Sequence, residues 1–597
     1  MKELWHLKKY FSKYKWRVLG GVLFVICANA LNSLTPLITG SAVSLISKTL
    51  EQASTSDEVR ETLKNSIGKD VFLLFLKYLA VALLAGGFTF LMRQSIIVVS
   101  RLMEYDLKAE IYDHYQRLDL AFYRKNNTGD LMNRITEDVS RVRMFIGPAV
   151  MYSINLFFTI FFCITYMLSL DKQLTLYVLI PLPFLSFLIY FLNEKIESSS
   201  THIQYKLSDL TTNAQETFSG IRVVQAYSRE AEMLRHFEAE CEEYKQRQLK
   251  LARLDAIYFP VMTFLVGVSI VVVIYAGGLH VGARKIDVGV LTSFLGFVNM
   301  LMWPVSSLGW TASLIQRAAA SQKRINEFLH QQPSVKDEGA LTEKIKGEIV
   351  FDKVSFTYPD TGIEALKSVS FHIKPGQRIA VIGKTGSGKT TIADLLMRMY
   401  DVTSGVITVD GKSLNQYKLG ELRRQMGFVP QDVFLFSETI SDNISFGLPE
   451  EDYNKSVQFA HMASIGKEIE EFPEKYDTMV GERGVTLSGG QKQRISIARA
   501  LIKEPNVLLL DDSLSAVDAA TEKQIQQNLD DLLQNKTAII ITHRIFSLIH
   551  FDNILVLEDG KIAEQGTHEQ LLAKRGIYTE IYEKQQLETR NEAFSTS

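Results

Sequence analysis

The chain has 597 residues, of which 46% are hydrophobic and 22% charged, and its formal net charge is −2. This length exceeds what one hydrophobic core organises, so we expect at least two domains. The near-zero net charge and the lack of a basic stripe interleaved with aromatic residues exclude nucleic acid as an expected partner.

The chain begins with a basic and aromatic stretch, MKELWHLKKYFSKYKWR, which has no short apolar core before a cleavage site. We expect no signal peptide here but a helix at the membrane surface; a frayed terminus is the alternative. Aromatic side chains suit the headgroup level, and basic ones suit anionic lipid. The residues in question are Trp5, Tyr10, Phe11, Tyr14 and Trp16, with Lys8, Lys9, Lys13, Lys15 and Arg17.

Six long apolar runs follow, each close to the ~20 residues that cross a bilayer as a helix. They cover about 18–46, 71–97, 145–168, 174–192, 258–279 and 288–313. Asn, Pro and Gly within these runs cost energy in lipid unless they face protein or water, so the helices are expected to bundle around a pathway. Packing explains any one of these residues equally well. Residues 1–315 are therefore predicted to form an all-α transmembrane domain of six helices.

Lys and Arg are concentrated in the N-terminal stretch and in two long connections, 101–144 and 194–257. Because basic connections stay on the cytoplasmic side, we expect the N-terminus, both connections and the C-terminal half in the cytoplasm. The connections are helical in pattern and extend spanning helices past the membrane. Their tips, 121–134 and 216–230, suit contact with a nucleotide domain, or form plain helical hairpins. The second tip places Phe218, Ile221 and Val224 or Gln225 on one face of a short helix.

A polar linker, 316–346, leads to a second domain, 347–597, with the alternating pattern of an α/β fold. In this domain GKTGSGKTT lies between a strand-like run and a helix-like segment, and it matches G-x-x-x-x-G-K-[ST], the pattern of a phosphate-binding loop. Lys389 is expected to reach the β and γ phosphates, and Thr390 to hold Mg²⁺. The predicted nucleotide-binding residues of this loop are Gly383, Lys384, Thr385, Gly386, Ser387, Gly388, Lys389, Thr390 and Thr391.

A second glycine motif, LSGGQ, comes roughly 100 residues after the first. It consists of Leu487, Ser488, Gly489, Gly490 and Gln491. It presents backbone donors just before a helix expected from Gln493, which makes another anion site. If the two loops flank opposite ends of one domain, LSGGQ does not reach the γ phosphate at the first loop, and it is expected to serve a second copy of that domain.

Single residues with candidate roles lie around these loops. Tyr358 is placed to stack on adenine and Gln431 to sense Mg²⁺ or the attacking water, although each is weak evidence alone. NVLLLDD predicts a buried parallel strand that ends at Asp511, a candidate Mg²⁺ ligand, and Asp512. A later strand ends at His543, which is placed to hydrogen-bond the γ phosphate.

With these motifs in this order behind six apolar runs, the chain resembles the ATP-binding cassette (ABC) exporters, and most closely a half-transporter of the multidrug and lipid exporter type. The resemblance covers essentially the whole chain. It implies ATP and Mg²⁺ as cofactors, and a pair of chains with ATP between the phosphate loop of one and LSGGQ of the other. By resemblance, the tips near Gly129 and Gly220 are coupling helices, and Tyr358, Gln431, Asp511, Asp518 and His543 are the adenine-stacking, glutamine-loop, Mg²⁺, D-loop and switch residues.

Asp512 departs from the family pattern, which usually has Glu as the general base at this position. Asp is one methylene shorter, so its carboxylate lies about 1.5 Å further back. A base must come within about 2.6–3.2 Å of the proton it removes, directly or through a water. Hydrolysis at this chain's own loop is therefore expected to be slow, which resembles one member of a heterodimer with unequal sites. A homodimer with a water-bridged Asp512 is the alternative.

The predicted function is ATP-driven export of amphipathic small molecules or lipids by alternating access, with Asp512, His543 and Gln431 as the candidate catalytic residues. The expected location is a bacterial inner membrane, because no organelle-targeting leader is visible. An ATP-gated channel or regulatory membrane protein is the alternative, which flux coupled to hydrolysis would exclude. A soluble cassette protein is disfavoured by the six apolar runs. The sequence leaves the substrate open.

Overall fold

The computed structural model describes residues 3–53, 57–481, 484, 486–514, 519–532, 534–543 and 551–595. The chain forms two compact units. Unit 1 comprises Met1–Tyr115 and Gly129–Gln331, and unit 2 comprises Gln116–Thr128 and Gln332–Ser597. The first expected tip therefore begins in unit 2, although most of the connection that carries it belongs to unit 1.

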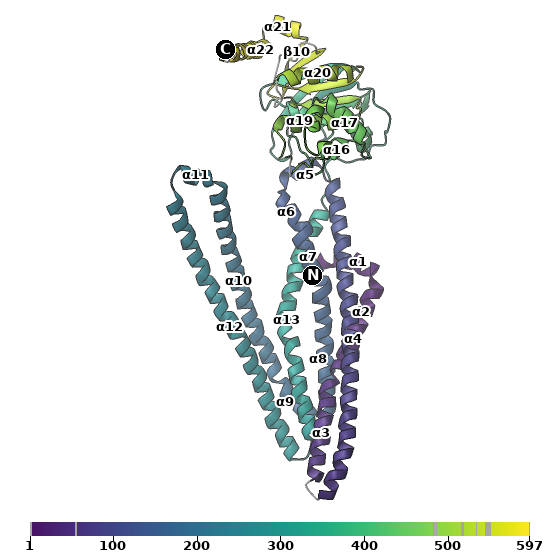
Figure 1. Ribbon diagram of the computed structural model, residues 1–597, viewed down its shortest axis with the longest axis vertical. Helices are drawn as coiled ribbons and strands as arrows, with labels where there is room; N and C mark the ends of the chain where they lie inside the picture. The colour runs from purple at the N-terminus through teal and green to yellow at the C-terminus, as the bar shows by residue number, and fades with distance from the viewer. Residues whose placement is uncertain are drawn as a thin grey trace. The chain divides into compact units, whose positions relative to one another are not determined.

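The described residues of unit 1 form helices joined by turns, with no strand, as expected for apolar runs whose backbone groups have to be satisfied within each segment. Figure 1 shows the long helices α10 and α12 side by side and joined at one end by α11. The helices are η1 (Glu3–Leu7), α1 (Lys8–Lys13), α2 (Lys15–Asn32), α3 (Thr35–Ala53), α4 (Asp57–Arg117), α6 (Thr128–Asn133), α7 (Val139–Met144), α8 (Val150–Leu170), α9 (Lys172–Leu179), α10 (Pro181–Ser219), α11 (Ile221–Ala226), α12 (Glu230–Gly282) and α13 (Val288–Leu329), with π-helical turns at Arg134–Asp138 and Phe145–Ala149.

Within the described residues, five helical stretches are long and apolar enough to cross a membrane. They are Lys15–Glu51, Gly68–Arg117, Thr128–Leu170, Glu230–Gly282 and Val288–Leu329. The remaining expected run, 174–192, is also helical, but it is divided between α9 and α10 at Pro181. Proline has no N–H to donate and is favoured in a helix's first turn, so a new helix begins there.

Helix α13 continues past the expected last span and through the first part of the predicted linker, 316–346. The helix continues because its apolar periodicity does: Ala318, Ile325 and Phe328 recur at helical spacing and are fully buried. Polar composition alone therefore places the start of the linker too early.

The N-terminal stretch is only partly available to lipid. Trp5 and Trp16 are exposed, as the expected surface helix requires. Lys13 instead forms an ion pair with Asp106 on α4 at 2.7 Å, and the Tyr14 hydroxyl donates to the same carboxylate at 3.0 Å. The expectation that the lysines and tyrosines face lipid is wrong at these positions, because acidic side chains on α4 attract them.

Unit 2 is α/β, and its described strands form two sheets. The antiparallel sheet has the order β2 (Glu364–Ile373), β1 (Ile349–Thr357), β4 (Ser404–Val409) and β5 (Lys412–Ser413). The other sheet has the order β10 (Lys561–Gly566), β9 (Asn553–Glu558), β3 (Arg378–Gly383), β8 (Thr537–Ile541), β7 (Val507–Asp511) and β6 (Met426–Val429). All its strands are parallel except β10. The fold class predicted from the sequence is confirmed in both halves.

The helices of unit 2 surround these sheets (Figure 1). They are α5 (Leu120–Lys125), α14 (Lys389–Leu396), α15 (Leu419–Arg424), α16 (Ile440–Ser445), α17 (Tyr453–Met462), α18 (Gly466–Glu470), α19 (Gly489–Leu501), α20 (Ala519–Leu532), α21 (His568–Lys574) and α22 (Ile577–Ser595), with short 3-10 turns at Leu414–Gln416 and Lys475–Asp477. Because β3, β7 and β8 are parallel neighbours of one sheet, their carboxyl ends meet at one edge, where open α/β sheets bind ligands.

Candidate functional site

A cavity of about 590 Å³ lies at the carboxyl ends of β3, β7 and β8. Its volume is typical of small-molecule sites. The predicted site residues that line it are Tyr358, Thr385, Gly386, Gly388, Lys389, Thr390, Thr391, Gln431, Asp511, Asp512 and His543. The tertiary structure thus brings together side chains that are up to 185 positions apart in the sequence, from Tyr358 to His543.

The glycine loop connects β3 to the first turn of α14. Gly388 has a φ of +99°, in the left-handed region that favours glycine. A Cβ at this position would lie 2.4 Å from the backbone oxygen of Ala365, so neither the backbone angle nor the space accepts a side chain. The loop therefore presents its N–H groups at a helix N-terminus, which is a suitable cradle for phosphate oxygens.

The loop carries a buried cation, the Lys389 ammonium, and a buried hydroxyl, that of Ser387. The Lys389 ammonium is buried and donates to the backbone oxygens of Gly383 and Lys384, both at 2.9 Å. Burial lowers the pKa of Lys389, and the nearby carboxylates Asp511 and Asp512 oppose that shift. The Ser387 hydroxyl is buried and has no hydrogen-bond partner in the described part of the chain. Both groups fit an anionic ligand, which would take over the hydrogen bonds of Lys389 and supply a partner for the Ser387 hydroxyl.

Asp511 ends the buried strand β7. Burial raises the pKa of its carboxyl; a hydrogen bond with Thr390 and the Lys389 charge oppose the rise, while Asp512 adds to it. Its Oδ2 atom is buried and has no hydrogen-bond partner in the described part of the chain. An unpartnered carboxylate oxygen beside a threonine hydroxyl is the kind of hard oxygen donor set that Mg²⁺ prefers, so the residues present fit this cation.

Asp512 and His543 also line the cavity. Asp512 has a φ of +46°, and its N–H donates to the backbone oxygen of Ile541 at 2.8 Å. This bond fixes the backbone from which the carboxylate extends. Burial, together with the Lys389 charge, lowers the pKa of His543, while Asp512 opposes the shift. Gln431 is exposed at the rim, just after β6.

The LSGGQ motif starts α19 at Gly489, four residues earlier than expected. Ser488 and Gln491 form a reciprocal capping box: Gln491 N–H donates to Ser488 Oγ at 3.2 Å, and Ser488 N–H donates to Gln491 Oε1 at 2.9 Å. The S-x-x-Q spacing is a sequence signal for this start. None of Leu487–Gln491 lines the cavity of the phosphate loop, and Ser488 is exposed. The predicted D-loop residue, Asp518, lies outside the described residues.

Sequence reasoning missed part of the cavity wall. Ile363, Glu364, Ala365, Lys367, Asp559 and Gly560 also line it. Asp559 and Gly560 form the turn between β9 and β10, and the Gly560 oxygen accepts from the Lys367 N–H at 2.8 Å. The Asp-Gly pair between two strands predicts a hairpin. Only the sheet order, however, places that hairpin beside the phosphate loop.

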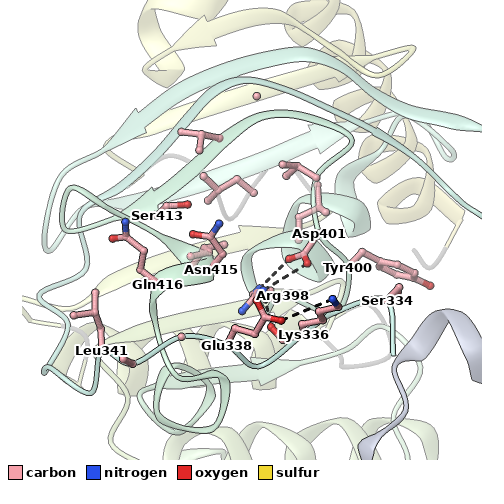
Figure 2. Close-up of a pocket in the computed structure, with 18 residues that line it drawn as sticks. Ser334, Lys336, Glu338, Leu341, Arg398, Tyr400, Asp401, Ser413, Asn415 and Gln416 are labelled. Carbon is pink, nitrogen blue, oxygen red and sulfur yellow. Dashed lines mark hydrogen bonds and ion pairs between the residues drawn. The ribbon is translucent and has the colours of Figure 1, made fainter. Parts of the chain in front are cut away.

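A second cavity of unit 2, of about 870 Å³, shares no lining residue with the first. At its centre is Arg398, which donates to Asp401 Oδ1 at 2.8 Å and to the Lys336 backbone oxygen at 3.0 Å (Figure 2). Arg398 thereby anchors the segment that precedes β1 to the end of α14. We assign this contact a structural role.

Unit 1 contains a cavity of about 480 Å³ lined by residues of α2, α3, α4, α8 and α13. The Asn29 amide, which is buried, donates to Asn155 Oδ1 at 2.9 Å, and Thr159 donates to Asn29. No charged side chain is found among the lining residues of this cavity. It is therefore a polar but uncharged cavity within the apolar half.

Comparison with known proteins matches both halves of the chain to one family. Residues 18–305 match the ABC transporter transmembrane region, and residues 366–515 match the ABC transporter domain. The chain is 36% identical to "Probable multidrug resistance ABC transporter ATP-binding/permease protein YheI" of Bacillus subtilis, over 98% of both chains. It is 34% identical to "Multidrug resistance-like ATP-binding protein MdlA" of Escherichia coli, over 98% of this chain and 96% of that one. It is also 34% identical to the "ATP-dependent lipid A-core flippase" of Syntrophus aciditrophicus, over 85% of both chains.

Such similarity, over both halves and nearly the full length, shows the family. The chain is a multi-pass membrane protein with one helical transmembrane half and one ATP-binding half, and such half-transporters act as dimers. It therefore belongs to the ABC transporter family, as an exporter half-transporter whose ATPase activity drives transport across the membrane.

Proposed function

We propose that this half-transporter pairs with a different chain, and that its own nucleotide site is the slower of the two in the dimer. The observation that supports this proposal is Asp512. Its carboxylate reaches about 1.5 Å less far than that of a glutamate. Because its N–H is bonded to Ile541, the backbone is not free to advance and restore the reach. A general base that falls short of its water slows hydrolysis.

In this proposal the residues of the nucleotide cavity bind ATP and Mg²⁺, and each has a role that suits its side chain. Lys389 and Ser387 contact phosphate oxygens, and Thr390 and Asp511 hold Mg²⁺, with Gln431 beside it. When bound, Mg²⁺ would neutralise charge on the β and γ phosphates. Asp512 orients water inefficiently and His543 donates to the γ phosphate.

The partner's site is completed by this chain's LSGGQ. Ser488 to Gln491 lie at the N-terminus of α19 and outside this chain's own nucleotide cavity, which supports a role toward ATP bound by a second chain. Closing of both sites on ATP then drives the transmembrane halves from inward to outward facing, and hydrolysis at the faster site resets them.

Exposed apolar surfaces support pairing. At the tip of unit 1 around α11, Phe218, Val223 and Tyr227 are 73%, 61% and 76% exposed. In unit 2, the rings of Phe434, Phe436 and Phe446 form an exposed aromatic patch, with centroids 5.2 and 4.6 Å apart in successive pairs. We propose that the tip of each chain docks on the corresponding patch of its partner, because an exposed apolar patch marks an interaction site. We also propose that the nucleotide unit lies in the cytoplasm, on the side of the two connections that are rich in Lys and Arg.

For the substrate we propose amphipathic drugs or lipids. The uncharged cavity of unit 1 combines amides and hydroxyls, such as those of Asn155 and Thr292, with the aromatic side chains Tyr78 and Trp303. Such a lining accepts neutral hydrogen-bonding groups and apolar surface together. The names of the relatives, two for multidrug resistance and one for a lipid A-core flippase, agree with this class.

Two substitutions in this chain test whether the two nucleotide sites of the dimer are unequal. ATPase activity is measured in lipid nanodiscs that contain this chain paired with a similar half-transporter encoded by a neighbouring gene. Lys389→Ala disables only this chain's slow site and is expected to reduce activity by less than about tenfold. Ser488→Ala disables the fast site and is expected to reduce activity by more than about tenfold, which corresponds to about 1.4 kcal/mol. Thr439→Ala removes a comparable capping box from α16 and controls for the lost helix cap.

The opposite result would identify a homodimer. If the chain alone hydrolyses ATP briskly, both Lys389→Ala and Ser488→Ala silence it, and Asp512→Ala does the same, then the unequal heterodimer is wrong. If the chain alone is nearly silent and Asp512→Glu activates it, the short carboxylate is the cause of the slow site.

A further inference from the structure

Helix α5 belongs to the first long connection of the membrane half, yet its contacts are with the nucleotide unit. Gln116–Thr128 falls within unit 2, and Leu120 and Ala121 pack against the hydrophobic core that includes β1 and α14. At the helix N-terminus, Asp119 accepts hydrogen bonds from the N–H groups of Phe122 and Val335, both at 3.1 Å. This loop is therefore held on the same scaffold as the nucleotide cavity.

Arg124, near the end of α5, lies against aromatic rings beside that cavity. Its guanidinium carbon is 5.1 Å from the ring centroid of Tyr358 and 5.7 Å from that of Tyr400. Figure 2 shows the Tyr400 ring turned away from Arg398, one of the two cationic residues that line the second cavity. The Tyr358 ring also meets that of Tyr400 edge-on, with centroids 5.6 Å apart. Arg124 thus packs on two perpendicular rings, one of which lines the nucleotide cavity.

The same rings and cation are connected to the helix of the phosphate loop. The Tyr358 hydroxyl is 3.0 Å from Thr391 Oγ1, and Arg124 is 4.0 Å from Asp394 Oδ2. Thr391 and Asp394 are three positions apart on α14, so they lie on the same face of that helix. Arg124, Tyr358 and α14 therefore form a closed set of contacts, in which moving one member disturbs the other two.

From these contacts we propose that Arg124 is a positioning residue for the nucleobase, holding the Tyr358 ring in the orientation in which adenine stacks on it. The inference rests on the proposed role of Tyr358. A cation over an aromatic ring is attracted to the negative face of the ring, and this attraction restrains the orientation of the ring. The loop that joins two spanning stretches is thereby in direct contact with the residue that binds the base.

Asp394 supplies the countercharge for Arg124. Its side chain is buried, and its Oδ2 atom has no hydrogen-bond partner in the described part of the chain. Burial raises the pKa of Asp394 to about 6; Arg124 opposes the rise and Asp511 adds to it. Near neutral pH the carboxylate is therefore ionised and attracts the guanidinium from the side of α14.

A double-mutant cycle on the full-length chain in nanodiscs tests the proposal, with the dissociation constant of a ribose-labelled fluorescent ATP as the readout. Arg124→Ala and Tyr358→Ala are each expected to weaken binding about threefold to tenfold, in the range of cation–π and stacking energies. The double variant is expected to bind no more weakly than Tyr358→Ala, because Arg124 acts through that ring. Lys125→Ala removes the neighbouring exposed cation and should change nothing.

Competition by inorganic tripolyphosphate distinguishes a role of Arg124 toward the nucleobase from general damage to the nucleotide site. This anion contacts the phosphate loop but has no base, so its inhibition constant should be the same in Arg124→Ala as in the original chain. Arg124→Lys, which keeps the charge, should recover part of the ATP affinity.

The proposal is overturned if Arg124→Ala binds ATP as the original chain does while Tyr358→Ala is weakened. It is also overturned if the two effects add fully, or if tripolyphosphate and ATP are weakened alike. If Tyr358→Ala itself has no effect, the adenine role of Tyr358 fails, and the positioning role of Arg124 fails with it.

Discussion

Burial determines the charge of the acidic residues around the phosphate loop. Asp511 and Asp394 are both buried, and burial is the largest effect on each, raising both pKa values above the usual range for aspartate. Asp511 retains a threonine hydroxyl and the Lys389 ammonium nearby, whereas the countercharge of Asp394 among the described residues is Arg124, 4.0 Å away. Burial disfavours the ionised carboxylate more than this one ion pair favours it, so Asp394 connects the stability of unit 2 to pH.

The raised pKa of Asp394 determines whether unit 2 gains or loses stability as pH falls. The pKa of Asp394 is raised from 3.8 to about 6, so the protonated carboxyl is favoured in the folded chain. Its stabilising contribution is complete below pH 3.8 and is lost as pH rises through 6. The difference between 3.8 and about 6, about 2.2 pH units, corresponds to about 3 kcal/mol in the free energy of unfolding. The original chain should therefore gain thermal stability relative to Asp394→Asn as pH falls from 7.5 to 5.

Thermal unfolding of both variants in nanodiscs between those pH values measures the effect. Asp360→Asn, which alters an exposed carboxylate of the same unit, should follow the original chain throughout. Parallel curves for the original chain and Asp394→Asn would show that Asp394 does not titrate in this range.

At the scale of elements, small residues allow α3 and α13 to approach closely. A Cβ on Gly289 would lie 2.1 Å from the Gly40 backbone oxygen and 2.1 Å from Ser44 Oγ. A Cβ on Gly40 would meet Ser293 and Gly289 at similar distances. Close approach through small residues is how helices associate in lipid, where the hydrophobic effect does not drive them together.

Gly289→Ala is therefore expected to destabilise unit 1. The new methyl group meets the Gly40 backbone oxygen as well as the Ser44 side chain; the backbone oxygen cannot rotate away, and such overpacking costs about 1–3 kcal/mol. The measurement is the thermal unfolding temperature in nanodiscs. Gly87→Ala on α4 is the matched control, because a Cβ there meets nothing within 4 Å and alanine favours a helix more than glycine does. Equal effects of the two substitutions would contradict this packing.

For the whole molecule, the proposed docking of α11 on a partner predicts that transport and hydrolysis can be separated. Phe218→Ser removes a 73% exposed phenylalanine from the tip. We expect substrate flux per ATP hydrolysed to fall at least about threefold, with ATP hydrolysis retained, because the tip rather than the nucleotide site is altered. Tyr205→Ser, on α10 and 67% exposed, is the control outside the tip. An unchanged flux per ATP in Phe218→Ser would refute the docking.

Much of the architecture is local in origin and was predictable. The apolar runs became helices because a backbone in lipid can satisfy its hydrogen bonds only within the segment. The phosphate loop was predictable because its pattern is local. The loop needs glycine where the backbone has a positive φ, as at Gly388, and a short stretch of sequence is enough to show these glycines. The early start of α19 also has a local signal in the sequence, the S-x-x-Q spacing of Ser488 and Gln491 that forms the capping box.

By itself the sequence thus determined the family, the two halves and the set of motifs. The tertiary structure decided which residues meet: it placed the Asp559–Gly560 turn and Ala365 in the wall of the nucleotide cavity, and Arg124 against Tyr358. Residues 124 and 358 are far apart in the chain, and no periodicity or spacing links them. Their contact depends on the packing of α5 against the core of unit 2, which exists only once the sheets and α14 have formed.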